Sequence, residues 1–191
     1  MSKLSRKERR ENKLKRPESR CERYVYVLLM RYPDTFSRIF RFFTRMRFSH
    51  ASIGIGGANG PFFSYVLKGF RRELPERYPT FNSREIPCRL YKLEVSEETY
   101  EKAKKALAVH EKKSKLLGFR YTVVGVILSI LRIIYKRNNR YFCSQFVSEL
   151  LEQVSAVPLQ KHSALYLPDD FTKMQELDLC FTGNISEMVK S

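Results

Sequence analysis

Residues 48–67, FSHASIGIGGANGPFFSYVL, decide how the centre of this chain folds. Residues 50–56, HASIGIG, have the pattern of a strand, and residues 62–67, FFSYVL, form a second one. The Gly-Ala-Asn-Gly segment between them contains Asn-Gly, the strongest short-range signal for a hairpin. The stretch therefore predicts two antiparallel strands, with His50 at the start of the first.

The segments before the hairpin predict one more strand and a helix. Residues 24–30, YVYVLLM, are continuously apolar, which is typical of a central strand buried on both faces. Asp34 or Thr35 can cap a helix that follows Pro33. In that helix the apolar side chains fall on one face and the arginines largely on the opposite face.

The segments after the hairpin predict further elements of both kinds. Residues 68–86 contain Gly, Pro and several charges and read as a long loop, whereas residues 88–95 alternate like a strand with one wet face. Ser96 can cap a helix that Gly118 would end. The later segments are expected to be an apolar helix over about 121–135, a helix over 142–155, a short helix from Pro168 and a short strand at 179–181. This order predicts an α+β fold, with an antiparallel sheet packed by helices.

Composition and charge suggest one domain with a basic arm. Residues 1–20 contain nine Lys or Arg, three Glu and no aromatic residue, so we expect a disordered or frayed arm before a domain over 21–191. The net charge of +16 favours polyanionic partners, either nucleic acid or an anionic membrane surface, through that arm. A solubilising surface with a basic tail would have the same charge.

The cysteine pattern and the apolar segments bear on the cellular compartment. The four cysteines are widely spaced without a CxxC pair, and no secretory signal is apparent, which is typical of reduced thiols in a cytosol. The longest apolar stretch, residues 121–135, contains Arg132 and is shorter than the roughly 20 residues of a membrane span. We therefore expect a soluble cytoplasmic protein that can rest peripherally on a membrane. No pattern indicates a metal or an organic cofactor.

Cys143 is the candidate nucleophile. A polar turn precedes it and apolar periodicity follows it, which puts Cys143 in the first turn of a helix. The unpaired N–H groups and positive end of a helix stabilise a thiolate there. The backbone amide of Cys143 or Ser144 is also placed to donate into an oxyanion hole. Since cysteine usually packs as a small hydrophobe, that reading stays open, and it is the one we assign to Cys21, Cys88 and Cys180, which lack a helix start.

His50 is the candidate general base among three histidines. It begins a strand, and a strand end holds a side chain rigidly, which suits a general base. His110 lies in a Lys-rich helix and is expected to be a solvated surface residue, while His162 lies in a loop. Tyr24, Tyr26 and Tyr121 are further candidates for lining the site, although most of them are expected to be core or interface aromatics.

The two segments together resemble a known family. Residues 48–55, FSHASIGI, and residues 142–151, FCSQFVSELL, resemble the circularly permuted branch of the NlpC-type papain-like hydrolases, which includes the YiiX-like bacterial proteins and the lecithin–retinol acyltransferase group. In that branch a strand His precedes the helix Cys in sequence. The LPDDF segment beginning at Leu167 is similar too, and the resemblance covers about residues 22–190.

The resemblance implies a mechanism in which His50 activates Cys143 and the thiolate forms a thioester with an amide or ester substrate. A third polar group normally orients the histidine. The hairpin places Ser64 or Tyr65 near that position, and we expect Ser64 to be the orienting residue, with Glu73 in the following loop as a second candidate. No carboxylate is expected on the returning strand itself, which is the main departure from many relatives.

Three functions follow from these observations. The first is a thiol hydrolase of peptides or acyl groups. The alternative is a non-catalytic basic protein that binds nucleic acid or anionic membrane. The third combines them in a lipid-acting acyl hydrolase or transferase that its basic arm steers to a surface. The apolar helix over 121–135 could dock on lipid, although a buried core helix is the commoner role for such a segment. The substrate, the third catalytic group and the oligomeric state stay open.

Overall fold

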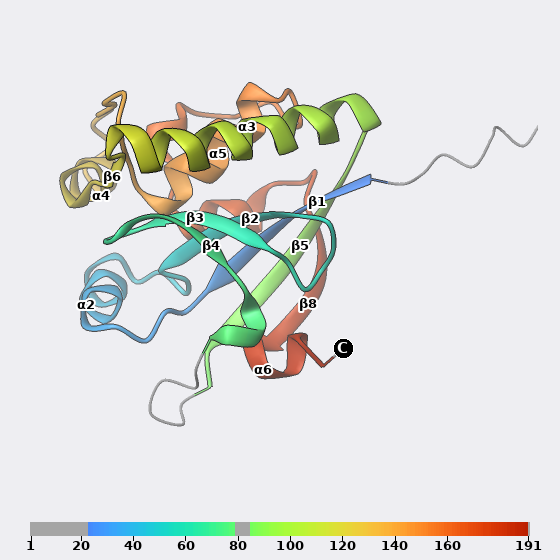
Figure 1. The fold of residues 1–191 in the computed structure, drawn as a ribbon. Coiled ribbons are helices and arrows are strands. Elements are labelled where there is room, and N and C mark those ends of the chain that lie inside the picture. The colour runs from blue at the N-terminus through green and yellow to red at the C-terminus, as the bar shows by residue number, and fades with distance from the viewer. Residues whose placement is uncertain (1–22, 79–84, 191) are drawn as a thin grey trace, which may run out of the picture.

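A computed structural model of the chain describes residues 23–78 and 85–190 (Figure 1). The predicted arm over 1–20 and Cys21 lie outside the described residues. The fold is α+β, as the order of elements predicts. Its main sheet is antiparallel throughout and has the strand order β4-β3-β2-β1-β5-β8.

The elements of the sheet and its helices are bounded as follows. The six strands are β1 (Arg23–Met30), β2 (His50–Ile55), β3 (Phe62–Val66), β4 (Gly69–Glu73), β5 (Pro87–Val95) and β8 (Asp178–Asn184). The α-helices are α2 (Thr35–Thr44), α3 (Glu97–Leu117), α4 (Val123–Ile130), α5 (Cys143–Gln153) and α6 (Ile185–Met188). Short 3₁₀ helices are η1 (Pro75–Arg77), η2 (Ser163–Leu165) and η3 (Pro168–Lys173), and β6 (Arg120–Tyr121) pairs in parallel with β7 (Arg140–Tyr141).

The hydrophobic core lies on both faces of the sheet, with β1 at its centre. On one face α3 and α5 cover the sheet, and β1 contributes Val25, Val27 and Leu29 to the core there. On the other face Leu28 and Met30 of β1 lie in a smaller cluster with the short helix α6. The uninterrupted apolar sequence of β1 is therefore explained by burial on both sides, as expected for a central strand.

The predicted helix boundaries agree with the observed caps. The Asp34 carboxylate accepts a hydrogen bond from the Ser37 N–H at the start of α2, and Ser96 caps α3 by accepting one from the Thr99 N–H. Gly118 ends α3 with φ of 60°, a left-handed conformation that glycine adopts at little cost. The strand expected at 179–181 is the middle of β8.

Two expectations about secondary structure are wrong. Residues 68–86 are not one long loop, because β3 turns through Leu67 and Lys68 directly into β4, and η1 follows. The left-handed φ of 103° at Gly69 permits this tight turn. The apolar helix is also shorter than 121–135, because α4 spans only Val123–Ile130 and Arg132 already has a positive φ. Within the described part of the chain, no helix combines the length and apolarity needed to cross a bilayer.

Candidate active site

Cys143 is the first residue of α5, as the sequence predicts. The residue before it, Phe142, has no side-chain cap for the helix, so the first N–H groups of α5 are not occupied by a capping side chain. Phe142 lies instead in a buried cluster with Phe40 and Val126. Only 4% of Cys143 is exposed. The sulfur atom therefore lies at a buried helix start, where an anion is stabilised by the helix end.

His50 is the first residue of β2 and lies opposite Met30 of β1. Its side chain is buried, and its Nε2 atom lies 3.0 Å from Oε1 and 3.2 Å from Oε2 of Glu73. Glu73 is the last residue of β4 and is equally buried. The Tyr32 ring lies 5.7 Å from the His50 ring, centroid to centroid, and shields it on one side. The imidazole is thus held between a carboxylate and the thiol.

The Glu73 carboxylate determines the charge of His50. Burial opposes the imidazolium form, but the charge of Glu73 and the hydrogen bonds with Cys143 and Glu73 outweigh it and raise the pKa of His50 to about 10. His50 is therefore protonated near neutral pH. Nε2 donates a hydrogen bond to Glu73, which leaves Nδ1 as the ring atom that can hydrogen-bond to the Cys143 sulfur.

Cys143 has the opposite shift. Burial alone would raise the pKa of its thiol, but the hydrogen bond and positive charge of His50, with hydrogen bonds from the Ala51 and Ser144 backbone, lower it. The Tyr121 hydroxyl also contacts the sulfur atom, and burial and the nearby Cys143 charge raise the pKa of this phenol. Tyr121 stays protonated and can donate to the thiolate, so it does line the site.

The position expected for Ser64 is occupied by Glu73. The Ser64 hydroxyl donates to the Ala51 carbonyl at 2.7 Å, where the ladder between β2 and β3 ends after the pairs Ile53–Phe63 and Gly54–Phe62. Ser64 thus replaces a missing ladder bond, and it is Glu73, the second candidate, that contacts His50. The signal for this was the glycine at position 69, since a tight turn there makes 69–73 a strand that ends at the carboxylate.

Tyr65 lies on the opposite face of the sheet from His50. It is fully buried under α3 and α5, and its hydroxyl is 3.3 Å from Nδ1 of His110. His110 is therefore not a solvated surface residue, and burial followed by the charge of Lys113 lowers its pKa to about 4. This histidine belongs to the aromatic core. His162 caps η2, where its Nδ1 accepts from the Ala164 N–H.

The hydroxyl and the backbone N–H of Ser144 make different contacts. The hydroxyl donates a hydrogen bond to the Tyr166 carbonyl at 2.7 Å. Its backbone N–H lies in the first turn of α5, where it contributes a hydrogen bond that lowers the pKa of Cys143. The oxyanion role of this amide stays a prediction. Within residues 23–78 and 85–190, no cluster of three or more His, Cys, Asp and Glu side chains is arranged for a metal ion.

A cavity of about 210 Å³ leads to His50. Its lining includes Phe36 and Ser37 of α2, Leu67 and Lys68 of the β3–β4 turn, and Tyr121, whose hydroxyl contacts the Cys143 sulfur. The volume accommodates a few heavy atoms of a side chain or an acyl chain rather than a large folded substrate.

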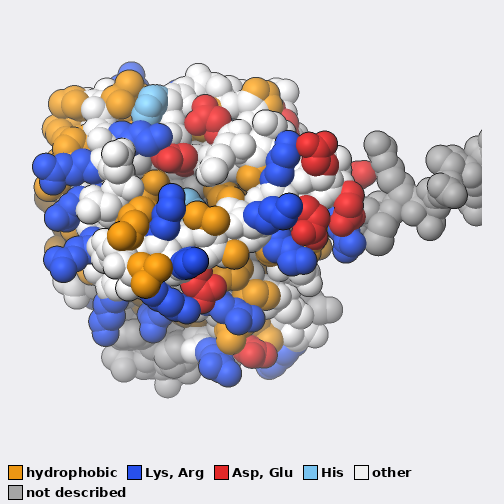
Figure 2. All heavy atoms as spheres, turned by 45° about the horizontal axis from the view of Figure 1, so that its top comes forward, with side chains coloured by type: hydrophobic (Ala, Val, Ile, Leu, Met, Phe, Trp, Pro, Cys, Tyr) orange, Lys and Arg blue, Asp and Glu red, His pale blue; other side chains and the backbone are white. Residues whose placement is uncertain are grey.

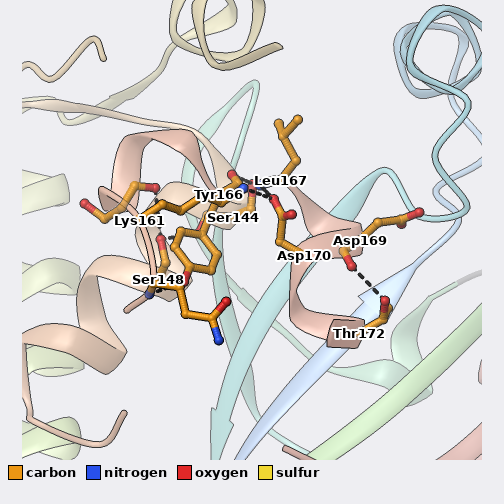
Figure 3. A network of polar contacts seen from close by, with 10 residues as sticks. Ser144, Ser148, Lys161, Tyr166, Leu167, Asp169, Asp170 and Thr172 are labelled. Atoms are coloured by element: carbon orange, nitrogen blue, oxygen red, sulfur yellow. Dashed lines mark hydrogen bonds and ion pairs between the residues drawn. The ribbon is translucent and has the colours of Figure 1, made fainter. Parts of the chain in front are cut away.

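A polar network fixes the start of α5 (Figure 3). The Ser144 hydroxyl reaches the Tyr166 carbonyl, and the Ser148 hydroxyl reaches the carbonyls of Ser144 and Ser163. The next N–H, of Leu167, donates to the Asp170 carboxylate at 2.8 Å. The turn of α5 that carries the sulfur atom is therefore bound to η2 and η3.

The same network reaches the histidine through Asp169, whose side chain points away from Ser144 in Figure 3. Its carboxylate accepts hydrogen bonds from the N–H groups of Arg47 at 2.8 Å and Phe48 at 2.9 Å, just before His50. Asp169 and Asp170 are adjacent in η3. One short helix thus fixes the segments that carry the sulfur atom and the imidazole.

We expect Asp169→Ala to destabilise the fold by about 2 kcal/mol, because two backbone donors lose a charged acceptor. Urea denaturation should show this as a lower midpoint with an unchanged slope. Asp178→Ala, in an exposed position on β8, is the matched control and should change little. Equal midpoints for the two variants would show that Asp169 does not hold the segment before His50.

Comparison with known proteins does not identify the chain. A scan against protein-family models gives no match, and a search of curated proteins finds no significant relative. The case for function therefore rests on the geometry of the site.

Proposed function

We propose that this chain is a cysteine-dependent hydrolase of amide or ester bonds in a peptide or acyl substrate, with a circularly permuted papain-like (NlpC-type) fold. The observation that carries the proposal is the buried series Cys143, His50 and Glu73, in which the thiol pKa is lowered and the imidazole pKa is raised. Two buried groups whose pKa values move in opposite directions are typical of an activated nucleophile and its base.

The chemistry proceeds in two steps. The Cys143 thiolate attacks the carbonyl carbon, a C–S bond forms, and His50 gives its proton to the departing amine or alcohol. Water then attacks the thioester while the neutral His50 accepts a proton from it; the C–S bond breaks, the carboxylic acid is released, and the thiolate–imidazolium pair is restored. The Ser144 amide and the Tyr121 hydroxyl are the donors proposed to stabilise the oxyanion. Glu73 is a positioning residue, since it acts through His50.

Alkylation of the thiols by iodoacetamide at pH 6, followed by peptide mapping, tests the proposal. Exposure alone predicts that Cys180 reacts before Cys143, because Cys180 is exposed and only 4% of Cys143 is. Thiolate content predicts the reverse, since burial raises the pKa of Cys180 and brings that of Cys88 to about 12. We expect Cys143 to react first.

The His50→Ala variant should slow modification of Cys143 by roughly a hundredfold, because burial then favours the neutral thiol. His162→Asn is the control, since asparagine can still cap η2, and it should behave like the natural chain. Preferential modification of Cys180, or a Cys143 rate that is indifferent to His50, would argue against the hydrolase.

A second candidate function is supported by one observation. A groove of about 1140 Å³ between α2 and the β5–β8 edge is lined by six arginines and no acidic side chain: Arg31, Arg38, Arg41, Arg45, Arg47 and Arg89. A non-catalytic protein that binds nucleic acid or anionic membrane would use such a surface. Binding to single-stranded RNA and duplex DNA across a salt series tests the nucleic-acid form of this function.

A further inference from the structure

Two helices at one end of the molecule expose large apolar side chains. We call this surface the apolar end and define it by six residues: Ile39, Phe42 and Phe43 of α2, with Val124, Ile127 and Leu131 in and just after α4. Phe42 and Phe43 are 79% and 77% exposed. Single exposed apolar residues are ordinary, but a contiguous set on neighbouring helices indicates a partner.

α4 exposes its larger apolar side chains, whereas a helix that packs on a protein core buries them. Its buried residues are Gly125, Val126 and Ser129, two of which have little or no apolar surface. Its larger side chains, including Val124 and Ile127, face outward. An amphipathic helix on a core does the reverse. The expectation of a buried core helix is therefore wrong for this segment, and packing within the fold does not explain its sequence.

α2 has the pattern of a helix that lies in an interface. Only Ser37 and Phe40 are buried. At 100° per residue, Ile39 and Phe43 extend the apolar face beyond the buried stripe, and the arginines of the helix occupy the opposite flank. A helix with exposed apolar side chains such as Ile39 and Phe43 on one side, arginines on the other and Phe42 at the border beside Arg38 suits the boundary between acyl chains and headgroups.

The two helices form one surface. Phe40 of α2 and Val126 of α4 belong to the same buried cluster, so the two helices meet on their buried sides. Figure 1 places both helices at the same end of the sheet, and at that end in Figure 2 hydrophobic side chains gather beside Lys and Arg. Phe36 of α2 and Tyr121, two residues before α4, also line the cavity that leads to His50.

Positive charge borders the apolar end on both sides. The arginine groove is lined in part by Ile39, Phe42 and Phe43 of the apolar end, and Arg132, Lys136 and Arg137 follow α4 in exposed positions. Cations near a bilayer gain about 1 kcal/mol each from anionic headgroups. Nucleic acid would complement the arginines and would stack bases on Phe42 and Phe43, which line the same groove, but aliphatic side chains such as Val124 and Ile127 gain nothing from it.

We propose that the apolar end docks on a bilayer that contains anionic phospholipid, with α2 and α4 in the interface and the arginines among the headgroups. The surface lies outside the basic arm and does not depend on the chemistry of Cys143. Docking would hold the cavity mouth against the lipid.

Fluorescence provides a direct test, because the chain contains no tryptophan. Phe43→Trp in the full chain places one reporter in the apolar end, and Leu179→Trp places one on β8, where the native side chain is 52% exposed. With vesicles of phosphatidylcholine and phosphatidylglycerol, the first reporter should shift to the blue and be quenched by brominated acyl chains. The second should do neither, because arm-driven adsorption inserts no side chain.

Co-sedimentation with the same vesicles tests whether removal of apolar side chains from the apolar end weakens binding. The double variant Phe43→Ser/Ile127→Ser should reduce the bound fraction at least about tenfold in high salt, where attraction by the arm is screened. Leu179→Ser is the control for Ile127, which has the same 52% exposure. The thermal unfolding midpoints of all variants should agree with that of the natural chain, since the replaced side chains are exposed.

Three outcomes would overturn the proposal. One is an unshifted or unquenched Phe43→Trp emission with anionic vesicles. The second is equal binding of Phe43→Ser/Ile127→Ser and Leu179→Ser. The third is that the natural chain binds RNA but not vesicles and that the double variant loses this RNA binding, which would assign the surface to nucleic acid.

Discussion

Glu73→Ala is expected to lower the free energy of unfolding by about 3–5 kcal/mol at pH 7, because it removes one partner of a buried charged pair. The variant leaves the His50 imidazolium without the carboxylate that offsets its burial. The folded-state pKa of His50 is raised from 6.5 to about 10, so this stabilisation is complete below pH 6.5 and is lost as pH rises through about 10. The difference from the natural chain should shrink in that range.

Glu73→Gln separates charge from shape. The amide retains a hydrogen-bond acceptor for Nε2 but no negative charge, so the pKa of His50 should fall and modification of Cys143 at pH 6 should slow at least about tenfold. Glu76→Ala, which removes an exposed carboxylate from η1, is the control for both variants. If Glu73→Ala lay within about 0.5 kcal/mol of Glu76→Ala, the buried pair would carry no stability.

The sequence was informative wherever local chemistry determines local structure. Asn-Gly predicts the hairpin, Asp34 and Ser96 predict helix starts, and Gly118 predicts a helix end, because turns and caps need those side chains or glycine's conformational freedom. Cys143 was found for the same reason, since a helix start is a local feature. The α+β class follows from the order of such elements.

The third polar group of the site depends on tertiary structure. Glu73 is 23 residues from His50 in sequence, and their contact depends on the turn at Gly69 and on the divergence of β2 from β3. Ser64 has the right position in sequence but is used to close that divergence. Strand register across three strands, which a single sequence specifies weakly, decides between the two candidates.

The sequence also does not predict which face of the α4 helix is buried in the fold. An apolar run such as residues 121–135 reads alike whether it faces a core or a partner, because periodicity reports which residues share a face and not what covers that face. The small residues Gly125 and Ser129 on the buried side carry the distinction. The expectation that His110 is solvated fails for a related reason, because the ring packs against Phe146 in the aromatic core although the charge of Lys113, three residues on, still acts on it.

Modification of Cys143 should rise less steeply with pH between about 6.5 and 9 than modification of an ordinary thiol. The pKa of the Cys143 thiol is lowered, chiefly by the hydrogen bond and charge of His50, so its ionisation begins at lower pH than that of an unperturbed thiol. His50, with a pKa of about 10, keeps its proton across this range and continues to favour the thiolate. An ordinary thiol would become about tenfold more reactive for each unit of pH below its own pKa.

The exposed thiol of Cys180 supplies the comparison within each sample, because burial raises its pKa and its modification rate should climb throughout the range. Unfolding the chain in urea removes both His50 and the helix start from Cys143, so the steep profile should return there. A Cys143 profile that rises in parallel with that of Cys180 in the folded chain would mean that the sulfur is a buried thiol. The proximity of His50 would then be packing, and the hydrolase proposal would fail with it.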